Sequence, residues 1–591
     1  MSTKKRNPKF VSYSNSSHIH EKIDSCAAAP QLPAALRGGA GASCAVILAA
    51  GFVAGAGVAN ADSILQQVGV TQLQQLNSSL NGSGMSVQQV EASVSAPSEV
   101  YEPSPGKLGI SPSDFTFVGY PNSGGGYSSA SYSWHAENVA SIFYGSAGVA
   151  PSISHIFVTA ADGFAGYYVF PQAAPPATAE VVNQSFAYLA EDQANIQYLD
   201  NAWDNYAASS NLLFVTAIGD GQTTSTVNGS YVNPPADMYN GIAVGAYTGT
   251  EAGGIYSPST GAEATWVGPT WDGRSKPDLV APGQWTSYTA PIVSGVATLM
   301  VQAGSGTDLA APVGFSASDA SIANGSSTAY TTAATDIRTV KALLLNGAVK
   351  PVGWTNSYSV NSGTYSYNAV STDATTPLDP RYGSGVVNAY NSYENLAGGE
   401  HNYSSATTQS IAALPSVTSA PTANFSGSVS EVASATNPAT VTGWNLATIM
   451  ATASSNAVEN YDFNLTGTSQ NSWDVTATLT WNKDYNASGI NHLMLFLLNS
   501  AGQQVAGSTS MVDNVQQINI NPALGINSLA PGQYDLAVEM LGGVNAISTS
   551  DTYALAWNFV DPTSVPEPAA LAIFAAGVGM FMLPRKRAAA R

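Results

Sequence analysis

The sequence is short of cysteine, and this shortage excludes several kinds of chemistry. Only two cysteines occur in 591 residues, Cys26 and Cys44, and both lie within residues 1–61. A chain that loses this segment holds no thiol. Disulfide bridges, cysteine-ligated zinc and thiol catalysis are therefore not expected in the remainder.

Charged residues are also scarce, at 9% of the chain, and basic residues are the rarer kind. Residues 62–584 carry a net charge of about −28 and contain no basic stripe that would displace the counterions of a nucleic acid. We therefore expect no nucleic-acid partner. The chain is nonetheless 44% hydrophobic, which favours two or three folded domains over a disordered chain.

The first 61 residues have the order of a secretory signal peptide. Basic residues come first, an apolar run follows at 44–61, and Ala59, Asn60 and Ala61 form a small-x-small cleavage pattern. We predict cleavage before Asp62 and export of the protein to the cell envelope or the extracellular medium.

The C-terminal segment 565–591 combines three features in order. Pro566, Glu567 and Pro568 precede an apolar stretch at 569–583, which is followed by a basic cluster. An ordinary single-pass tail anchor is one interpretation, since positive charge stays on the cytoplasmic side of a membrane. The order also resembles the PEP-CTERM sorting signal of bacteria. That resemblance implies transient membrane anchoring and a partner, an exosortase-type sorting enzyme, that removes the segment.

Residues 62–399 alternate between strand-like and helix-like runs. Expected strands lie at 85–90, 153–160, 212–219 and 242–246, and expected helices at 136–144, 191–208, 287–302 and 339–345. This alternation predicts an α/β fold, with a doubly wound, mostly parallel sheet that carries helices on both faces. The active residues of such a sheet lie at the carboxyl ends of its strands.

A second, all-β domain is predicted at 441–562, after a linker rich in Ser, Thr, Ala and Pro at 400–440. Alternate residues are apolar in the stretches 473–481, 534–540 and 553–559, as in strands with one buried face. A β-sandwich with these aromatic residues in its core is the favoured interpretation. An aromatic platform that binds an exopolysaccharide is the alternative.

The stretch Ala281–Gly295, APGQWTSYTAPIVSG, places Ser287 at the expected start of a helix. Free amide groups and the positive end of the helix dipole surround such a position. Ser287 is therefore either part of a helix cap or a nucleophile held at the helix start.

This stretch, together with the KPDLVAPG that leads into it, resembles the serine block of the subtilisin-like peptidases (subtilases). Further blocks occur in the order of that family: the first strand at 81–92, the histidine block at 134–158, the substrate-cleft strand at 181–186 and the strand ending at the oxyanion position at 212–221. The resemblance implies a subtilisin-like peptidase domain over residues 62–399.

The resemblance also implies a role for six residues. These are the nucleophile Ser287, the general base His135, Glu91 in place of the family's aspartate, Asp220 at the oxyanion position, and Ser185 and Phe186 along the substrate cleft. In such a triad the base takes the proton of the nucleophile, and the acid holds the imidazole in one tautomer.

Two departures from the family pattern keep a second hypothesis open. Trp285 replaces a glycine, and Asp220 replaces an amide whose loss costs roughly 10²–10³ in rate. The chain is thus either a secreted serine endopeptidase that works through an acyl-enzyme, or a catalytically impaired pseudo-peptidase that serves as a binding or matrix-associated surface protein. We expect no cofactor, and the scattered carboxylates predict no metal site.

Overall fold

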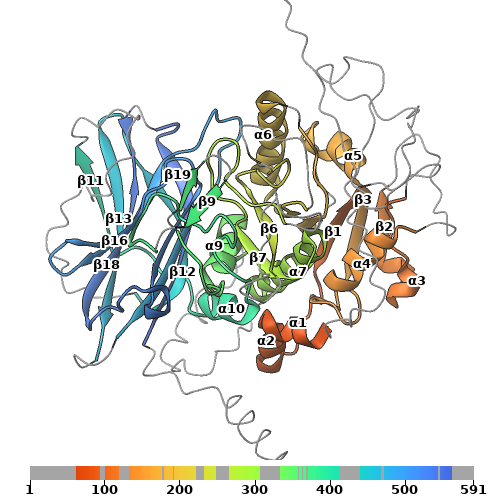
Figure 1. The fold of residues 1–591 in the computed structure, drawn as a ribbon, viewed down its shortest axis with the longest axis horizontal. Helices are drawn as coiled ribbons and strands as arrows, with labels where there is room; N and C mark the ends of the chain where they lie inside the picture. Colours follow the sequence, from red (N-terminus) through yellow and green to blue (C-terminus); the bar gives the residue numbers. More distant parts are fainter. Residues whose placement is uncertain are drawn as a thin grey trace, which may run out of the picture.

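The computed structural model describes residues 61–92, 100–118, 132–175, 179–190, 192–220, 230, 232–247, 265–306, 333–356, 358–361, 364–367, 370–410, 439–467, 472–543 and 546–561. An α/β region and a β-sandwich lie side by side (Figure 1). The predicted signal peptide before Ala61 and the motif Pro566, Glu567 and Pro568 lie outside the described residues. Within the described ranges, no helix has the length and apolarity needed to cross a membrane.

Seven strands form the central sheet, and every neighbouring pair is parallel. In spatial order they are β2 (Phe115–Val118), β3 (His155–Ala160), β1 (Ser86–Glu91), β4 (Ala179–Gln184), β5 (Leu213–Ala217), β6 (Gly241–Tyr247) and β7 (Leu279–Pro282). The predicted parallel sheet is confirmed. Strand β1 lies between β3 and β4 and ends at Glu91. Glu91 therefore lies at the carboxyl ends of the strands, with a neighbouring strand on each side.

Helices cover both faces of this sheet. The helices of the described residues are α1 (Ala61–Gln67), α2 (Val70–Leu76), α3 (Pro105–Leu108), α4 (Trp134–Phe143), α5 (Ala161–Phe164), α6 (Gln193–Ser210), α7 (Thr286–Ser305), α9 (Ile337–Asn346) and α10 (Ala389–Ala397), with short helical turns at Pro112–Asp114, Ala165–Val169 and Pro522–Leu524, the last of which belongs to the sandwich.

The two faces are told apart by neighbouring side chains of β4 and β5. Asn183 of β4 accepts a hydrogen bond from Ser294 of α7 at 3.0 Å, and its register partner on β5 is Val215. Phe214, next to Val215, therefore points to the opposite face, where its ring packs on Tyr206 of α6. Helix α7 thus lies on one face of the sheet and α6 on the other.

Two antiparallel sheets build the sandwich. One has the order β10 (Asp373–Ala374), β16 (Gln504–Ser508), β15 (Leu493–Asn499), β18 (Gly532–Met540), β13 (Ser455–Leu465) and β11 (Ser405–Ser410), in which only the short β10 pairs in parallel. The other has the order β12 (Thr442–Met450), β19 (Ser550–Val560), β14 (Asp474–Trp481) and β17 (Val515–Ile520). A separate hairpin joins β8 (Tyr358–Asn361) and β9 (Thr364–Tyr367).

Trp481, Tyr553 and Trp557 of the alternating aromatic residues lie in the core of the sandwich, whereas Trp473 and Tyr534 pack against it and are only partly buried. Trp481, Tyr553 and Trp557 are at most 1% exposed, in one cluster with the apolar side chains that alternate with them. The core interpretation is therefore confirmed for these three residues. Side chains so deeply buried offer no platform for a polysaccharide.

The predicted linker at 400–440 differs from the structure at its beginning. Residues Ser405–Ser410 form β11, which pairs with β13 at the edge of the larger sheet. Their Ser/Thr-rich composition suits an exposed edge strand as well as a linker, so composition alone did not separate the two. Residues 411–438 lie outside the described part.

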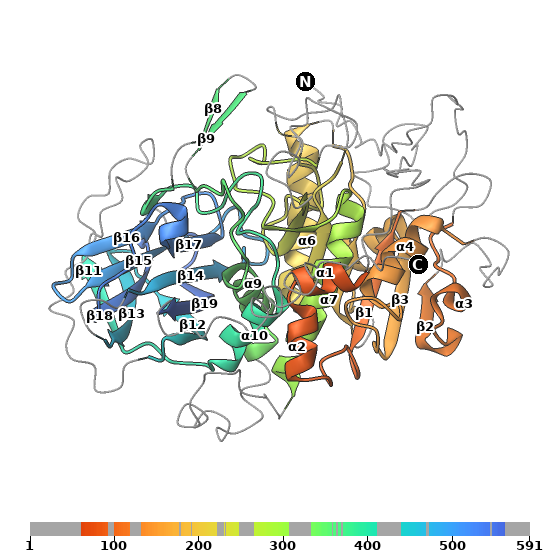
Figure 2. The same cartoon turned by 60° about the horizontal axis from the view of Figure 1, so that its bottom comes forward.

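Helix α9 joins the sandwich to the α/β region, as Figures 1 and 2 show from two sides. Thr480 of β14 donates a hydrogen bond to the carbonyl of Arg338 at 2.8 Å, and Gln517 of β17 donates to the carbonyl of Leu345 at 3.2 Å. Both ends of α9 are thereby held against the smaller sheet. The sandwich is fixed to the α/β region by direct contacts and not only by the chain connection.

Candidate active site

Ser287 is the second residue of α7, directly after the turn that follows β7. Pro291 stands four residues later and has no amide hydrogen, so the carbonyl of Ser287 lacks its usual helical donor. Ser185, just after β4, supplies the missing bond, because its hydroxyl donates to that carbonyl at 2.9 Å. The proline thus ties the helix start to the end of a neighbouring strand.

His135 and Glu91 form a buried pair beside this helix start. His135 lies in the first turn of α4, which Ser133 caps by accepting a hydrogen bond from the amide of Ala136 at 3.2 Å. His135 Nδ1 is 2.7 Å from Glu91 Oε2, and the side chains are 3% and 0% exposed. Since a carboxylate only accepts, Nδ1 carries the hydrogen of this bond and points the other nitrogen, Nε2, away from Glu91.

The hydroxyl of Ser287 is not bonded to His135 in this structure. It donates to the carbonyl of Ser185 at 3.4 Å, and His135 Nε2 has no hydrogen-bond partner among the described residues. The start of α7 nevertheless lies close to the imidazole, because the ring of Tyr288, the residue after Ser287, is 6.0 Å from it. The free nitrogen is the one that a general base needs.

Asp220 caps α7. Its carboxylate accepts from the amide of Thr286 at 3.0 Å and from the hydroxyl of Thr286 at 2.7 Å. Burial raises the pKa of Asp220 to about 7, against the lowering effects of the hydrogen bonds from Thr286 and from the amide of Ser287, and of the nearby His135. The predicted oxyanion residue therefore acts here as an acceptor at the amide of Ser287 and not as a donor.

The position of Asp220 depends on the glycine before it. Gly219 has a φ of +115°, a conformation that side chains rarely adopt, and a Cβ built on it would lie 2.1 Å from the ring of Trp266. Gly219 also donates its amide to the hydroxyl of Thr286 at 3.2 Å. The Gly-Asp pair is thus placed against the start of α7 by the backbone.

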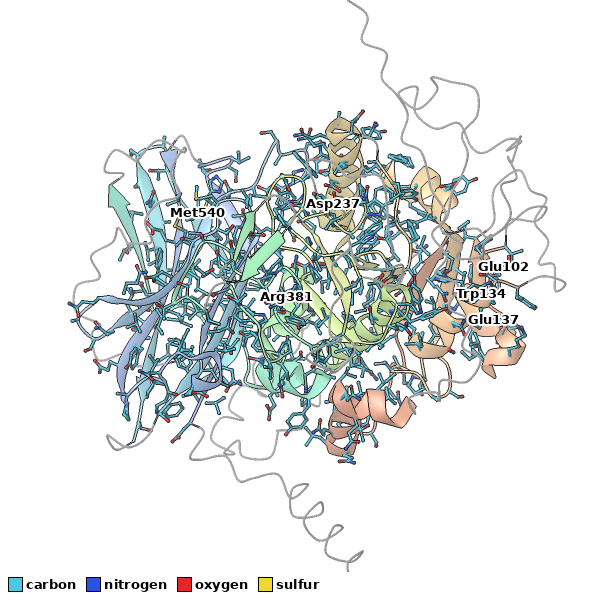
Figure 3. All side chains as sticks on the ribbon, in the orientation of Figure 1. Glu102, Trp134, Glu137, Asp237, Arg381 and Met540 are labelled. Carbon is cyan, nitrogen blue, oxygen red and sulfur yellow. The ribbon has the colours of Figure 1, made fainter. Side chains whose placement is uncertain are left out.

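The two predicted cleft residues point inward. Ser185 is 1% exposed and binds the backbone of Ser287, and Phe186 is 4% exposed with its ring 5.2 Å from that of Tyr188. Neither side chain faces solvent. The outer edge of the site is marked instead by Trp134, which is 42% exposed beside His135, and by Glu137 of the same helix (Figure 3).

Two residues of the site were missed by the sequence interpretation. Gln89 bonds the carboxylate of Glu91, and Tyr144 bonds Gln89. A signal was present, because Gln89 is a polar residue two positions before Glu91 on the same face of a buried strand. Among the described residues, no three His, Cys, Asp or Glu side chains are grouped as ligands of a metal would be.

One comparison with known protein families bears on the class of this domain. Residues 110–385 match the model of the subtilase family, Peptidase_S8, a range that includes His135, Asp220 and Ser287 but begins after Glu91. The match covers just under half of the chain, so residues 110–385 are similar to a subtilase domain, and the all-β sheets follow them. No curated protein sequence matches the chain.

Two solved structures are similar in fold. Fervidolysin from Fervidobacterium pennivorans, a keratinolytic enzyme related to subtilisin, shares 13% identity over 85% of this chain and 77% of its own, with a TM-score of 0.32. Tripeptidyl peptidase 2 shares 11% identity over 72% of this chain, with a TM-score of 0.29. This chain spans 40% of tripeptidyl peptidase 2.

Proposed function

We propose that the protein is an exported serine endopeptidase in which Ser287, His135 and Glu91 form the catalytic triad. The single observation that carries the proposal is the buried 2.7 Å contact of His135 with Glu91 beside the helix that begins with Thr286 and Ser287. The family match over residues 110–385 supports a serine-type peptidase.

The chemistry follows from the hydrogen positions. The Ser287 hydroxyl turns from the Ser185 carbonyl toward His135 Nε2, gives up its proton and forms a bond to the peptide carbonyl carbon. His135 then passes this proton to the leaving amine as the peptide C–N bond breaks, which leaves an acyl-enzyme on Ser287. Water hydrolyses the acyl-enzyme by the same route. Glu91 stabilises the imidazolium while the proton resides on His135.

Asp220 determines how well the tetrahedral oxyanion is stabilised. An ionised carboxylate at the amide of Ser287 would repel the developing negative charge, whereas a protonated carboxyl would donate a hydrogen bond to it. We therefore propose that the neutral form of Asp220 is the catalytically competent one. Asp220→Asn supplies a permanent donor and is expected to raise kcat above pH 7.

A fluorophosphonate probe tests the proposal directly, because it reacts only with an activated serine. We expect labelling of the purified protein that is lost in Ser287→Ala and retained in Ser294→Ala, a matched serine in the middle of α7. Absence of labelling from pH 4 to 9 in a protein that is folded by circular dichroism would refute the triad. Casein hydrolysis, lost in the same variant, would identify endopeptidase activity.

One observation favours a second candidate, a pseudo-peptidase that binds peptides without cleaving them. The carboxyl group of Asp220 accepts hydrogen bonds from the amides at the helix start, where an oxyanion would bind, and the Ser287 hydroxyl donates to the carbonyl of Ser185. Peptide binding measured by calorimetry, with no turnover in either the parent or Asp220→Asn, would establish this candidate.

Export and sorting are also part of the proposal. The small-x-small pattern at Ala59–Ala61 and the Pro566–Pro568 motif support a secreted protein that is transiently anchored and then released by an exosortase-type enzyme. N- and C-terminal peptide mapping of the protein from its native host tests this. A mature chain that still begins before Asp62 or retains residues after Pro568 would contradict it.

A further inference from the structure

Gln89 is bonded to Glu91 within the same strand. Residues two apart in a strand point to the same face, and the Gln89 amide nitrogen donates to Glu91 Oε1 at 2.8 Å. Both side chains are fully buried. The carboxylate is therefore divided between two partners, since Oε1 accepts from Gln89 and Oε2 accepts from His135.

The orientation of the Gln89 amide follows from its partners. Its nitrogen also lies 3.0 Å from the carbonyl of Ala136, and its oxygen accepts from the hydroxyl of Tyr144. A carboxylate and a carbonyl have no hydrogen to give, so the nitrogen must face both of them. The oxygen is then left for the tyrosine hydroxyl, and both hydrogens and the oxygen of the amide are used.

This geometry connects both members of the pair to one side chain. Ala136 is the neighbour of His135 in the first turn of α4, so Gln89 binds the helix that carries the base as well as the acid that orients it. The link matters more for glutamate than for aspartate, because glutamate has one more rotatable bond that must be held. Tyr144 is fully buried below the pair, and burial, followed by the charge of Glu91, raises its pKa, so it remains a neutral donor.

We propose that Gln89 and Tyr144 are positioning residues that adapt this catalytic site to a glutamate, by holding Glu91 and the start of α4 in one hydrogen-bonded unit. The inference rests on the proposed triad for its catalytic consequence. The effect on the geometry of the Glu91–His135 hydrogen bond can be tested even if the protein has no peptidase activity.

The matched pair of variants is Gln89→Met and Gln88→Met. Gln88 is the adjacent residue of the same strand, is equally buried, and points to the opposite face, where it donates to Thr159 at 2.9 Å. Methionine nearly keeps the volume of glutamine and removes its hydrogen bonds. The two variants therefore share the cost of losing a buried amide, and only Gln89→Met disturbs the carboxylate.

Two readouts separate positioning from general stability. The first is the low-field proton NMR signal of the His135 Nδ1 hydrogen bonded to Glu91, which requires no activity and is assigned by its loss in His135→Gln. The second is the fluorophosphonate labelling rate together with kcat and KM. We expect Gln89→Met to lose or shift the signal and to lower the labelling rate and kcat on the order of 10- to 100-fold at unchanged KM. Gln88→Met should keep the signal and the rates.

Each outcome decides between alternatives. An unchanged signal in Gln89→Met, or equal rates in Gln89→Met and Gln88→Met, would overturn the inference. A parent protein that shows the signal but is neither labelled by the probe nor able to cleave peptides would refute the proposed function. The NMR comparison of the variants would still test whether Gln89 positions Glu91. If Gln89→Met does not fold, Tyr144→Phe, which removes a single hydroxyl, takes its place. A shifted signal in it supports the inference, and an unchanged signal overturns it.

Discussion

Asp220 accepts hydrogen bonds from both the amide and the hydroxyl of Thr286, at 3.0 and 2.7 Å. This pair fixes the first turn of α7 and puts a buried carboxyl group next to Ser287. The same contact therefore bears on the stability of the fold and on its chemistry, and both depend on pH.

Stability should fall as Asp220 ionises. Its pKa is raised from an unfolded value near 4 to about 7 by burial, so the folded state takes up the proton more readily. The associated stability is fully present below pH 4 and is lost as the pH rises through 7. Asp220→Asn lacks this dependence, so the variant should gain on the parent by up to about 4 kcal/mol between pH 4 and 8.

Urea unfolding at several pH values measures this difference. Asp192→Asn is the matched control, because Asp192 caps α6 through a 2.9 Å bond from Asn195 at a solvent-exposed position. A difference between Asp220→Asn and the parent that does not grow with pH would contradict the expected ionisation.

The bond from Ser185 to the carbonyl of Ser287 should matter because of Pro291. Ser185→Ala leaves that buried carbonyl without a donor and should cost about 1–3 kcal/mol, with slower probe labelling. Pro291→Ala restores a helical amide to the same carbonyl, so Ser185→Ala should cost less in that background. A double-mutant cycle by thermal unfolding measures the coupling, and strictly additive effects would exclude it.

The length of Glu91 should be essential. Glu91→Asp withdraws the carboxylate by one methylene from a 2.7 Å contact with His135 and from Gln89, and should lower kcat roughly 100-fold. Glu394→Asp makes the same change in a hydrogen-bonded pair with Tyr390 on α10, outside the site, and should leave kcat unaltered. Equal activity of Glu91→Asp and the parent would show that Glu91 does not orient the base.

The sandwich and the peptidase region should unfold together. Thr480, Gln517 and Thr478 of the sandwich bind Arg338, Leu345 and Asn346 at both ends of α9, a helix whose apolar side also belongs to the peptidase core. Differential scanning calorimetry should give one transition. Two well-separated transitions would show that the regions are independent, and Gln517→Ala, which removes one of these bonds, should lower the common transition.

Much of the α/β fold could be predicted because its signals are local. The strand that ends at Ala217 and the helix that follows Trp285 are both rich in apolar residues, and the alternation around Trp481 and Trp557 predicted a sandwich core that the structure confirms for these residues. The edge strand β11 was not predicted, because a polar strand with one exposed side has the same composition as a linker. Its partner strand, β13, lies some fifty residues away in the chain.

The sequence by itself determined which residues are available for chemistry. It has no thiol outside the first 61 residues and few basic residues, and it contains Glu91, His135 and Ser287 in the order that the resemblance to the subtilases implies. Only the tertiary structure decided what each does. It turned Asp220 into an acceptor, bonded Ser185 to a carbonyl that Pro291 leaves free, and placed Gln89 against the carbonyl of Ala136 at the start of α4. These are contacts between strand ends and helix starts, and they depend on how the sheet brings distant segments together, which no local pattern encodes.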